Sequence, residues 1–151
     1  MRTEPAGVRL IVDVANVMGS RPDGWWRDRA AAATRWLADL DGLVGRSVSL
    51  PDALPDALPG ALSDGLTVVT LTDVVAVIEG QARAARAPDG AAVRVVRAQR
   101  DGDSAVVEVT EQALVDEVRP VVVTADRGLR DRLPPGAVVV GPGWLLRLPP
   151  G

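Results

Sequence analysis

Short runs of apolar residues, each bounded by charged or turn-forming residues, divide this chain into alternating strands and helices. The first run, Val8 to Val12, ends in Asp13. An unbroken run of this kind is typical of a parallel strand whose two faces are both covered by helices. Further strands are predicted at residues 66–71, 74–78, 92–98, 121–123 and 137–140; the runs 66–71 and 74–78 form two short strands or one interrupted strand.

The segments between these runs have helical spacing. Apolar side chains recur every three or four residues from Trp26 to Leu40, which predicts a helix that begins at Trp25. A second helix is predicted over residues 105–118 with Asp103 as its N-cap, although its valine-rich start has the propensity of a strand. Short helices are predicted at residues 127–133 and after Gly141.

This alternation predicts an α/β fold in which a mostly parallel sheet of about five strands is covered by helices on both faces, a three-layer α/β/α arrangement. Right-handed crossovers and a reversal of direction after the third strand give the strand order 3-2-1-4-5. All 151 residues are assigned to a single domain. Within it, the Pro-rich segment 46–64 is predicted to be a surface connection.

Composition excludes several classes of chemistry. The chain has no cysteine and no histidine, which rules out structural zinc, disulfides, thiol nucleophiles and Ser-His-Asp triads. All 17 basic residues are arginines, so a P-loop lysine and a Schiff base are excluded too. The net charge of −3 argues against nucleic-acid binding through the overall charge of the protein, but it allows a local surface rich in arginine. With no apolar leader and no membrane-length run, we expect a cytoplasmic protein.

Acidic residues follow the predicted strands. Asp13, Glu79 and Asp126 come after apolar runs, and Asp103 opens a helix that follows one. In the predicted order these acids converge at the carboxyl ends of the strands, where open α/β sheets bind ligands. Carboxylates that lie close together are costly without a cation, and Mg²⁺ or Mn²⁺ prefers oxygen ligands. The pattern therefore predicts a divalent-metal site.

Each acid also has a plainer interpretation. Asp103 and Asp126 could serve only as helix N-caps, Asp13 as a turn or cap residue, and Glu79 as a solvated loop residue. Asn16, the single asparagine, either forms a turn or orients the neighbouring carboxylate or a substrate phosphate. These alternatives stay open at the level of sequence.

The motifs resemble those of one family. Ile11-Val-Asp-Val-Ala-Asn-Val-Met-Gly19 resembles the opening strand of PIN-like NYN-domain ribonucleases, including their YacP-like branch. Val121-Val-Val-Thr-Ala-Asp-Arg-Gly-Leu129 is similar to the late strand of that family, whose Thr/Ser-x-Asp carries an acid into the same site. Arg100-Asp-Gly-Asp-Ser-Ala-Val-Val107 looks like the acid-led helix start between them. The segment from Gly19 to Arg29 looks like that of small actinobacterial proteins of this type.

The resemblance implies a PIN-like domain that acts as a Mg²⁺- or Mn²⁺-dependent ribonuclease. It assigns Asp13, Asp103 and Asp126 as the acids of the site, places Asn16 beside them, and adds Glu79 as a further acid. At Ser104 the chain departs from the second acid sometimes found after the helix-start aspartate, which puts metal occupancy there in doubt.

Arginine and tryptophan follow the first strand. Arg21 and Arg27 are predicted to bind substrate phosphate, because arginine binds phosphate bidentately and both residues lie just beyond Asp13. Alternatively, Arg27 pairs with a nearby aspartate. For Trp25 and Trp26 we favour a place in the core over base stacking.

Three functions remain open. The first is a metal-dependent ribonuclease, with RNA as the expected partner. The second is a metal-dependent phosphohydrolase acting on nucleotides or other small phosphates. The third is a non-catalytic RNA-binding module with a decayed site. No membrane partner is expected, and a homodimer is left open.

Overall fold

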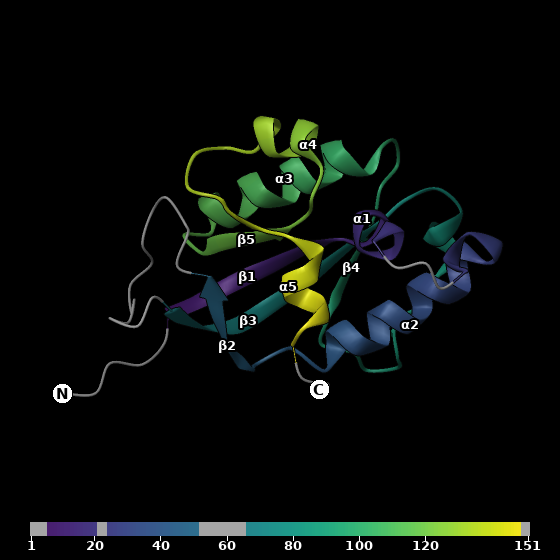
Figure 1. Ribbon diagram of the computed structural model, residues 1–151, viewed down its shortest axis with the longest axis horizontal. Coiled ribbons are helices and arrows are strands. Elements are labelled where there is room, and N and C mark those ends of the chain that lie inside the picture. Colours follow the sequence, from purple (N-terminus) through teal and green to yellow (C-terminus); the bar gives the residue numbers. More distant parts are fainter. Residues whose placement is uncertain (1–5, 21–23, 52–65, 149–151) are drawn as a thin grey trace.

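The computed structural model describes residues 6–20, 24–51 and 66–148 (Figure 1). Its centre is a six-stranded, mostly parallel sheet. The strands are β1 (Ala6–Asp13), β2 (Ser47–Pro51), β3 (Leu66–Ile78), β4 (Arg94–Arg97), β5 (Arg119–Val123) and β6 (Val138–Val140). They run in the order β2-β3-β1-β5-β6, and β4 pairs with β3.

The predicted α/β fold is confirmed, and the strand order differs from the prediction in one detail. β4, β3, β1, β5 and β6 follow one another as expected, all through parallel pairs. The additional strand, β2, pairs antiparallel with the first part of β3. It begins inside the segment predicted to be a surface connection, so that prediction is wrong for residues 47–51. The rest of the segment, from residue 52, lies outside the described residues.

Side-chain alternation explains why β2 is a strand. Val48 and Leu50 are buried while Ser47 and Ser49 are exposed, which is the period of two expected for a strand with one buried face. Trp144 donates from its indole Nε1 to the backbone oxygen of Ser49 over 2.9 Å, which ties the last helix to this edge strand.

β3 is one continuous strand with an irregularity in its middle. Val8 of β1 pairs with Leu71, whereas the next residue, Arg9, pairs with Asp73, so Thr72 is skipped. The Thr72 hydroxyl donates to the backbone oxygen of Val8 over 3.0 Å and closes this break in the ladder. The shift places Asp73 opposite Arg9.

Helices lie on both faces of the sheet (Figure 1). They are α1 (Val14–Gly19), α2 (Arg29–Asp41), α3 (Gly102–Val115), α4 (Arg127–Arg132) and α5 (Pro142–Leu146), with the 3-10 turns η1 (Trp25–Arg27) and η2 (Gly80–Ala84). The predicted helix from Trp25 therefore starts later, at Arg29. Asp28 ends η1 and caps α2 by accepting from the Ala31 backbone nitrogen over 3.0 Å.

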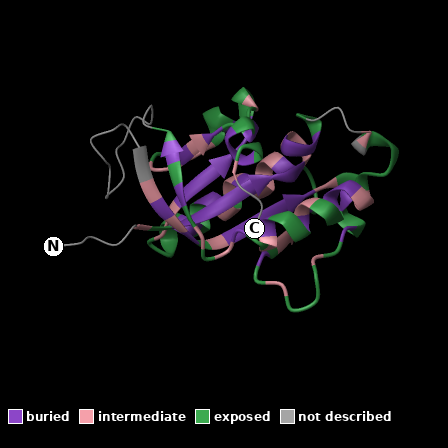
Figure 2. Cartoon of the chain, turned by 60° about the horizontal axis from the view of Figure 1, so that its bottom comes forward, coloured by how far each residue is buried: buried purple, intermediate pink, exposed green. Residues whose placement is uncertain are grey.

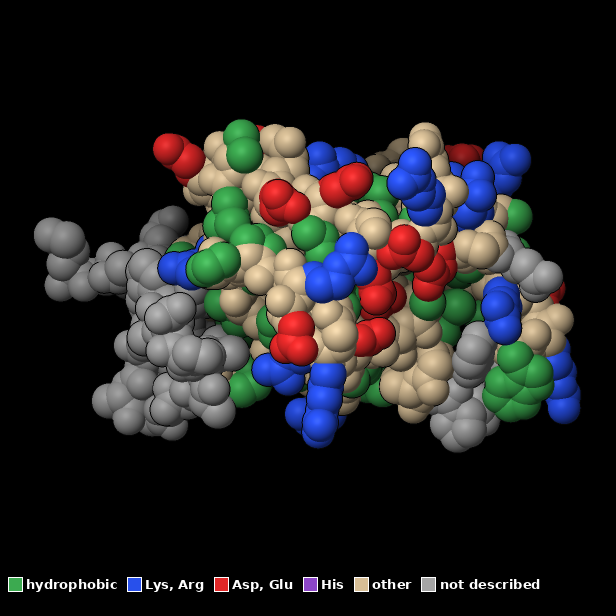
Figure 3. Space-filling view, turned by 90° about the horizontal axis from the view of Figure 1, so that it is seen from above, with side chains coloured by type: hydrophobic (Ala, Val, Ile, Leu, Met, Phe, Trp, Pro, Cys, Tyr) green, Lys and Arg blue, Asp and Glu red, His purple; other side chains and the backbone are tan. Residues whose placement is uncertain are grey.

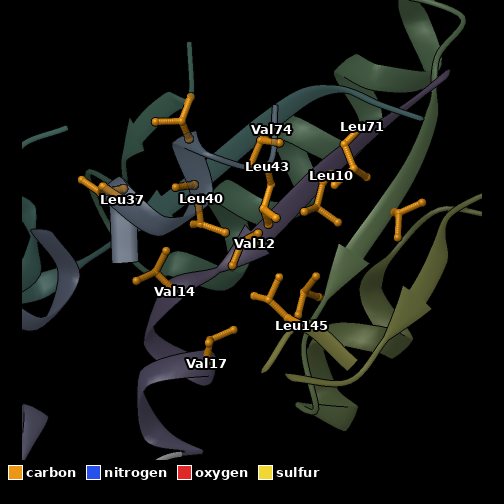
Figure 4. Close-up of a cluster of buried hydrophobic side chains, with 14 of the residues drawn as sticks. Leu10, Val12, Val14, Val17, Leu37, Leu40, Leu43, Leu71, Val74 and Leu145 are labelled. Atoms are coloured by element: carbon orange, nitrogen blue, oxygen red, sulfur yellow. The ribbon is translucent and has the colours of Figure 1, made fainter. Parts of the chain in front are cut away.

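Two clusters of buried hydrophobic residues lie on opposite faces of the sheet, and the central strands are buried along most of their length (Figure 2). On one face, Leu10 and Val12 of β1 pack with Leu37 and Leu40 of α2 (Figure 4). On the other face, the intervening β1 residue Ile11 belongs to a cluster with residues of β3, β5, α3 and α4. Both faces of the central strands are thus covered, which explains their continuous apolar sequence.

The helices of the described residues are too short and too polar to cross a membrane.

Candidate functional site

The carboxyl ends of three neighbouring parallel strands meet at one edge of the sheet. β1 ends at Asp13, β3 is followed by Glu79, and β5 is followed by the segment from Thr124 to Asp126. Because β1 lies between β3 and β5, the direction of the strand order reverses at β1. Ligands of open α/β sheets bind at such a switch point. Asp13 therefore lies where this fold class places its ligands.

The carboxylate of Asp13 is buried, and each of its two oxygens accepts a hydrogen bond. Its side chain caps α1, with Oδ1 accepting from the Asn16 backbone nitrogen over 3.3 Å. Oδ2 accepts from the Thr124 hydroxyl over 3.2 Å, and the residue is only 6% exposed. Burial, with a smaller contribution from the charges of Asp103 and Glu79, raises the pKa of Asp13 to about 6 against the lowering effect of these two hydrogen bonds.

Thr124 joins Asp13 to the loop that carries Asp126. The same buried hydroxyl that donates to Asp13 accepts from the Asp126 backbone nitrogen over 3.1 Å. Asp126 in turn caps α4, because its Oδ1 accepts from the Leu129 backbone nitrogen over 3.1 Å. Thr124 was absent from the predicted site residues. Its signal in the sequence is a hydroxyl directly after a buried strand and two residues before an acid.

Asn16 makes a second link between the same two regions. Its side-chain oxygen accepts from the Ala125 backbone nitrogen over 2.8 Å, which connects α1 to the loop between β5 and α4. Its own backbone nitrogen donates to Asp13. Asn16 thus uses its carbonyl oxygen to position the loop, while its side-chain NH₂ group has no hydrogen-bond partner among the described residues.

Asp103 lies in the first turn of α3 but does not cap it, so the predicted cap is wrong. The N-cap is Asp101, whose Oδ1 accepts from the Ser104 backbone nitrogen over 2.7 Å. The Asp103 carboxylate has no hydrogen-bond donor in the described part of the chain. Partial burial raises its pKa, the charges of Asp126, Asp101 and Glu79 add to this effect, and the charge of Arg132 opposes it.

Glu79 connects the end of β3 to the start of α3. Its Oε2 accepts from the Gly102 backbone nitrogen, the first residue of the helix. A side chain at position 102 would displace Glu79 from this place, since a Cβ atom there would lie 2.8 Å from the carboxyl carbon of Glu79. Glu79 is therefore partly buried and held, rather than being a solvated loop residue.

These four acids form what we call the acidic cluster, defined as Asp13, Glu79, Asp103 and Asp126. Figure 3 shows acidic side chains gathered on the face that carries α3 and α4, with arginines on either side of them. The charges of Asp103 and Glu79 raise the pKa of Asp13, and those of Asp126 and Glu79 raise the pKa of Asp103, so these carboxylates lie within electrostatic range of one another. However, among the described residues no three acidic side chains are close enough together to hold one ion.

The donor set fits a hydrated hard cation. Carboxylate, amide and hydroxyl oxygens are the ligand types that Mg²⁺ and Mn²⁺ accept, and Mg²⁺ usually takes only one or two carboxylates directly, keeping waters on its other positions. Two of the four carboxylates could therefore hold an ion without a third. A cation would also offset the burial and the repulsion that together raise the pKa of Asp13 and of Asp103.

The predicted phosphate-binding residues lie in η1 and just before it. Arg21 falls outside the described residues, as does the side chain of Trp25. Arg27 is exposed in η1, and no contact joins it to the acidic cluster within the described ranges. Trp26 is 52% exposed, so its predicted place in the core is wrong. The reason is that α2 starts only at Arg29, which leaves Trp26 off the apolar stripe of the helix.

Comparisons with models of protein families, with characterised proteins and with solved structures found no match to this chain. The resemblance to NYN-domain ribonucleases therefore stays a prediction, and the functional argument rests on the geometry described above.

Proposed function

We propose that this protein is a divalent-metal-dependent ribonuclease that hydrolyses RNA phosphodiester bonds at the acidic cluster. The observation that carries the proposal is the buried Asp13 at the switch point, within electrostatic range of Asp103 and Glu79 and joined through the Thr124 hydroxyl to the loop that carries Asp126. A purely structural cap would need none of these other charges. A bound cation, in contrast, makes such an arrangement favourable.

Each residue has a part in this proposal. Asp13 and Asp126 would hold the ion, and Asp103 would hold a second ion or position the attacking water. Glu79 would be a further metal-binding acid of the site. When bound, a divalent metal lowers the pKa of a coordinated water and stabilises charge on the leaving oxygen. Thr124 and Asn16 fix the Asp13 carboxylate and the Asp126 loop relative to each other. RNA as substrate agrees with the predicted cytoplasmic location.

The test is cleavage of a labelled single-stranded RNA with Mn²⁺ or Mg²⁺. We expect cleavage by the parent, none in excess chelator, and a loss of at least a hundredfold in Asp13→Asn. The control is Asp131→Asn, which removes an exposed acid from α4 without touching the cluster. If Asp13→Asn cuts RNA as fast as the parent, Asp13 has no catalytic role and the proposal is wrong.

One rival is supported by a specific observation. Because no three acids of the described residues can share one ion as placed, a non-catalytic RNA-binding module with a decayed site also fits. Its signature is RNA binding that is unchanged by chelator, together with no cleavage in any metal. Free nucleotides are included in the same assay, since release of phosphate from them without RNA cleavage would instead identify a small-phosphate hydrolase.

A further inference from the structure

Arg132, the last residue of α4, is held beside the acidic cluster by the first turn of α3. Its Nη2 donates to the Ser104 hydroxyl over 3.0 Å, and its Nη1 lies 4.0 Å from Oδ1 of Asp101. Ser104 itself donates to Oδ2 of Asp101 over 3.1 Å. The guanidinium is thus held between α3 and α4. Asp103 in the first turn of α3 and Asp126 at the N-cap of α4 both belong to the acidic cluster.

The guanidinium keeps donors for a ligand. Its side chain is 48% exposed, and one hydrogen bond plus one long ion pair use only part of its five N–H groups. The ion pair with Asp101 is itself exposed, so it contributes little to stability. Arginine presents its donors in a planar fork that matches the oxygens of a phosphate group. A guanidinium that is positioned but incompletely used suits an anionic ligand.

The location of Arg132 indicates which phosphate it would bind. Its tethers, Asp101 and Ser104, lie next to Asp103 but outside the acidic cluster. Arg132 therefore lies at the edge of the acidic cluster, close enough for its charge to oppose the rise in the pKa of Asp103. On the assumption of the proposed function, we propose that Arg132 binds the RNA phosphate next to the one being hydrolysed. This selects a polynucleotide strand over a mononucleotide as the substrate.

The experiment compares Arg132→Gln with Arg130→Gln. Arg130 is exposed on the same helix and its side chain makes no hydrogen bond or ion pair in the described part of the chain, so its variant loses the same charge without losing the proposed contact. Both are made in an Asp13→Asn background, in which a ten-nucleotide single-stranded RNA is expected to stay intact. Binding is then measured in Mg²⁺ across a range of salt concentrations.

We expect Arg132→Gln to weaken binding roughly tenfold, as for loss of a charged hydrogen bond. The slope of log K against log salt should fall by about 0.7, the value for one phosphate contact on a single strand. Arg130→Gln should change both far less. Equal effects of the two variants would overturn the inference, because they would show only loss of bulk charge.

A second variant separates binding from a structural role. Ser104→Ala removes the tether but keeps the guanidinium, so its affinity should stay within about threefold of the parent. If Ser104→Ala and Arg132→Gln weaken binding equally and the salt slope is unchanged in both, Arg132 only fastens α4 to α3, and the inference fails.

The two proposals fail separately. If the parent cleaves RNA and the two arginine variants bind RNA equally, the proposed ribonuclease function stands and the proposed role of Arg132 is wrong. Binding that depends on Arg132 without any cleavage removes the ribonuclease and keeps Arg132 only as a residue that binds an RNA phosphate. A parent that neither binds nor cleaves RNA overturns both.

Discussion

At the scale of single residues, Asp13 shows that a helix cap and a functional candidate can be the same side chain. One oxygen caps α1, as the plainest interpretation of the sequence holds. The other oxygen accepts from Thr124, which directly follows β5 and lies more than a hundred residues later in the chain. A cap is normally exposed and favourable, whereas this one is buried among like charges. The ionised form of Asp13 therefore costs stability.

The pH dependence of stability follows from this cost. The pKa of Asp13 is raised from 3.8 to about 6 in the folded protein, so between these values the folded state keeps a proton that the unfolded state releases. The free energy of unfolding should then fall as pH rises from about 4 to about 6, by roughly 3 kcal/mol, and stay low above that range.

Urea unfolding of the parent and of Asp13→Asn, without metal, checks this prediction. Asn keeps an acceptor for the cap but carries no charge, so the difference between the two proteins isolates Asp13. We expect the free energy of unfolding of Asp13→Asn, relative to that of the parent, to increase between pH 4.5 and pH 7.5. A difference that does not change with pH would show that the Asp13 carboxylate is not destabilised by burial.

At the scale of elements, α3 is fastened at both ends, and this places Asp103. At its start, Gly102 donates to Glu79 and Asp101 caps the first turn. At its end, Asp116 accepts from the buried Arg9 over 2.8 Å. Arg9 also donates to Asp73 over 3.1 Å, a pair that the skipped residue in β3 makes possible. The buried charge of Arg9 is thus paired on both sides, as a charge in the interior requires.

Gly102→Ala tests how Glu79 depends on α3. The new Cβ would meet the carboxyl group of Glu79, which is the end of a flexible side chain and can move away. We therefore expect a folded protein whose stability changes by no more than about 1 kcal/mol, since alanine improves helix propensity while the contact with Glu79 is lost. Metal-dependent cleavage should fall, because the displaced Glu79 leaves the cluster.

The control variant is Gly141→Ala, at the N-cap of α5, where a Cβ would meet nothing within 4 Å, and we expect it to cleave RNA like the parent. If Gly102→Ala cleaves RNA like the parent while its crystal structure shows Glu79 displaced, then Glu79 has no part in the site.

At the scale of the whole molecule, the sheet brings together acids that are distant in the sequence. Parallel pairing of β1 with β3 and of β1 with β5 places their carboxyl ends side by side. The covering helices then begin at this edge, so their caps and first turns add further acids. The cluster is a consequence of topology, and its repulsion is a cost that the whole fold carries.

Metal binding should relieve this cost. At pH 7.5 we expect Mg²⁺ at ten times its dissociation constant to stabilise the parent by about 1.4 kcal/mol, which raises Tm by a few degrees in a chain of this size. Asp13→Asn should show a much smaller shift, and Asp131→Asn the full one. Differential scanning calorimetry with and without Mg²⁺ makes the measurement, and an unchanged Tm in the parent would exclude tight binding at the cluster.

The sequence by itself determined the fold class, the relative order of five strands, and the acids that follow them. These features depend on local patterns: the period of apolar residues, the residues that end each run, and the fixed hand of crossover connections. The metal site and its chemistry remain predictions from those same patterns.

Only the tertiary structure decided which acid caps which helix and what holds each one. Asp101 rather than Asp103 caps α3, Trp26 is exposed, Asn16 bonds to Ala125, and Arg132 lies over the start of α3. Caps are ambiguous in a segment such as Asp101-Gly-Asp103, where either acid has the right residue type. The other contacts join residues far apart in the chain, and no local pattern records which partner a side chain will meet.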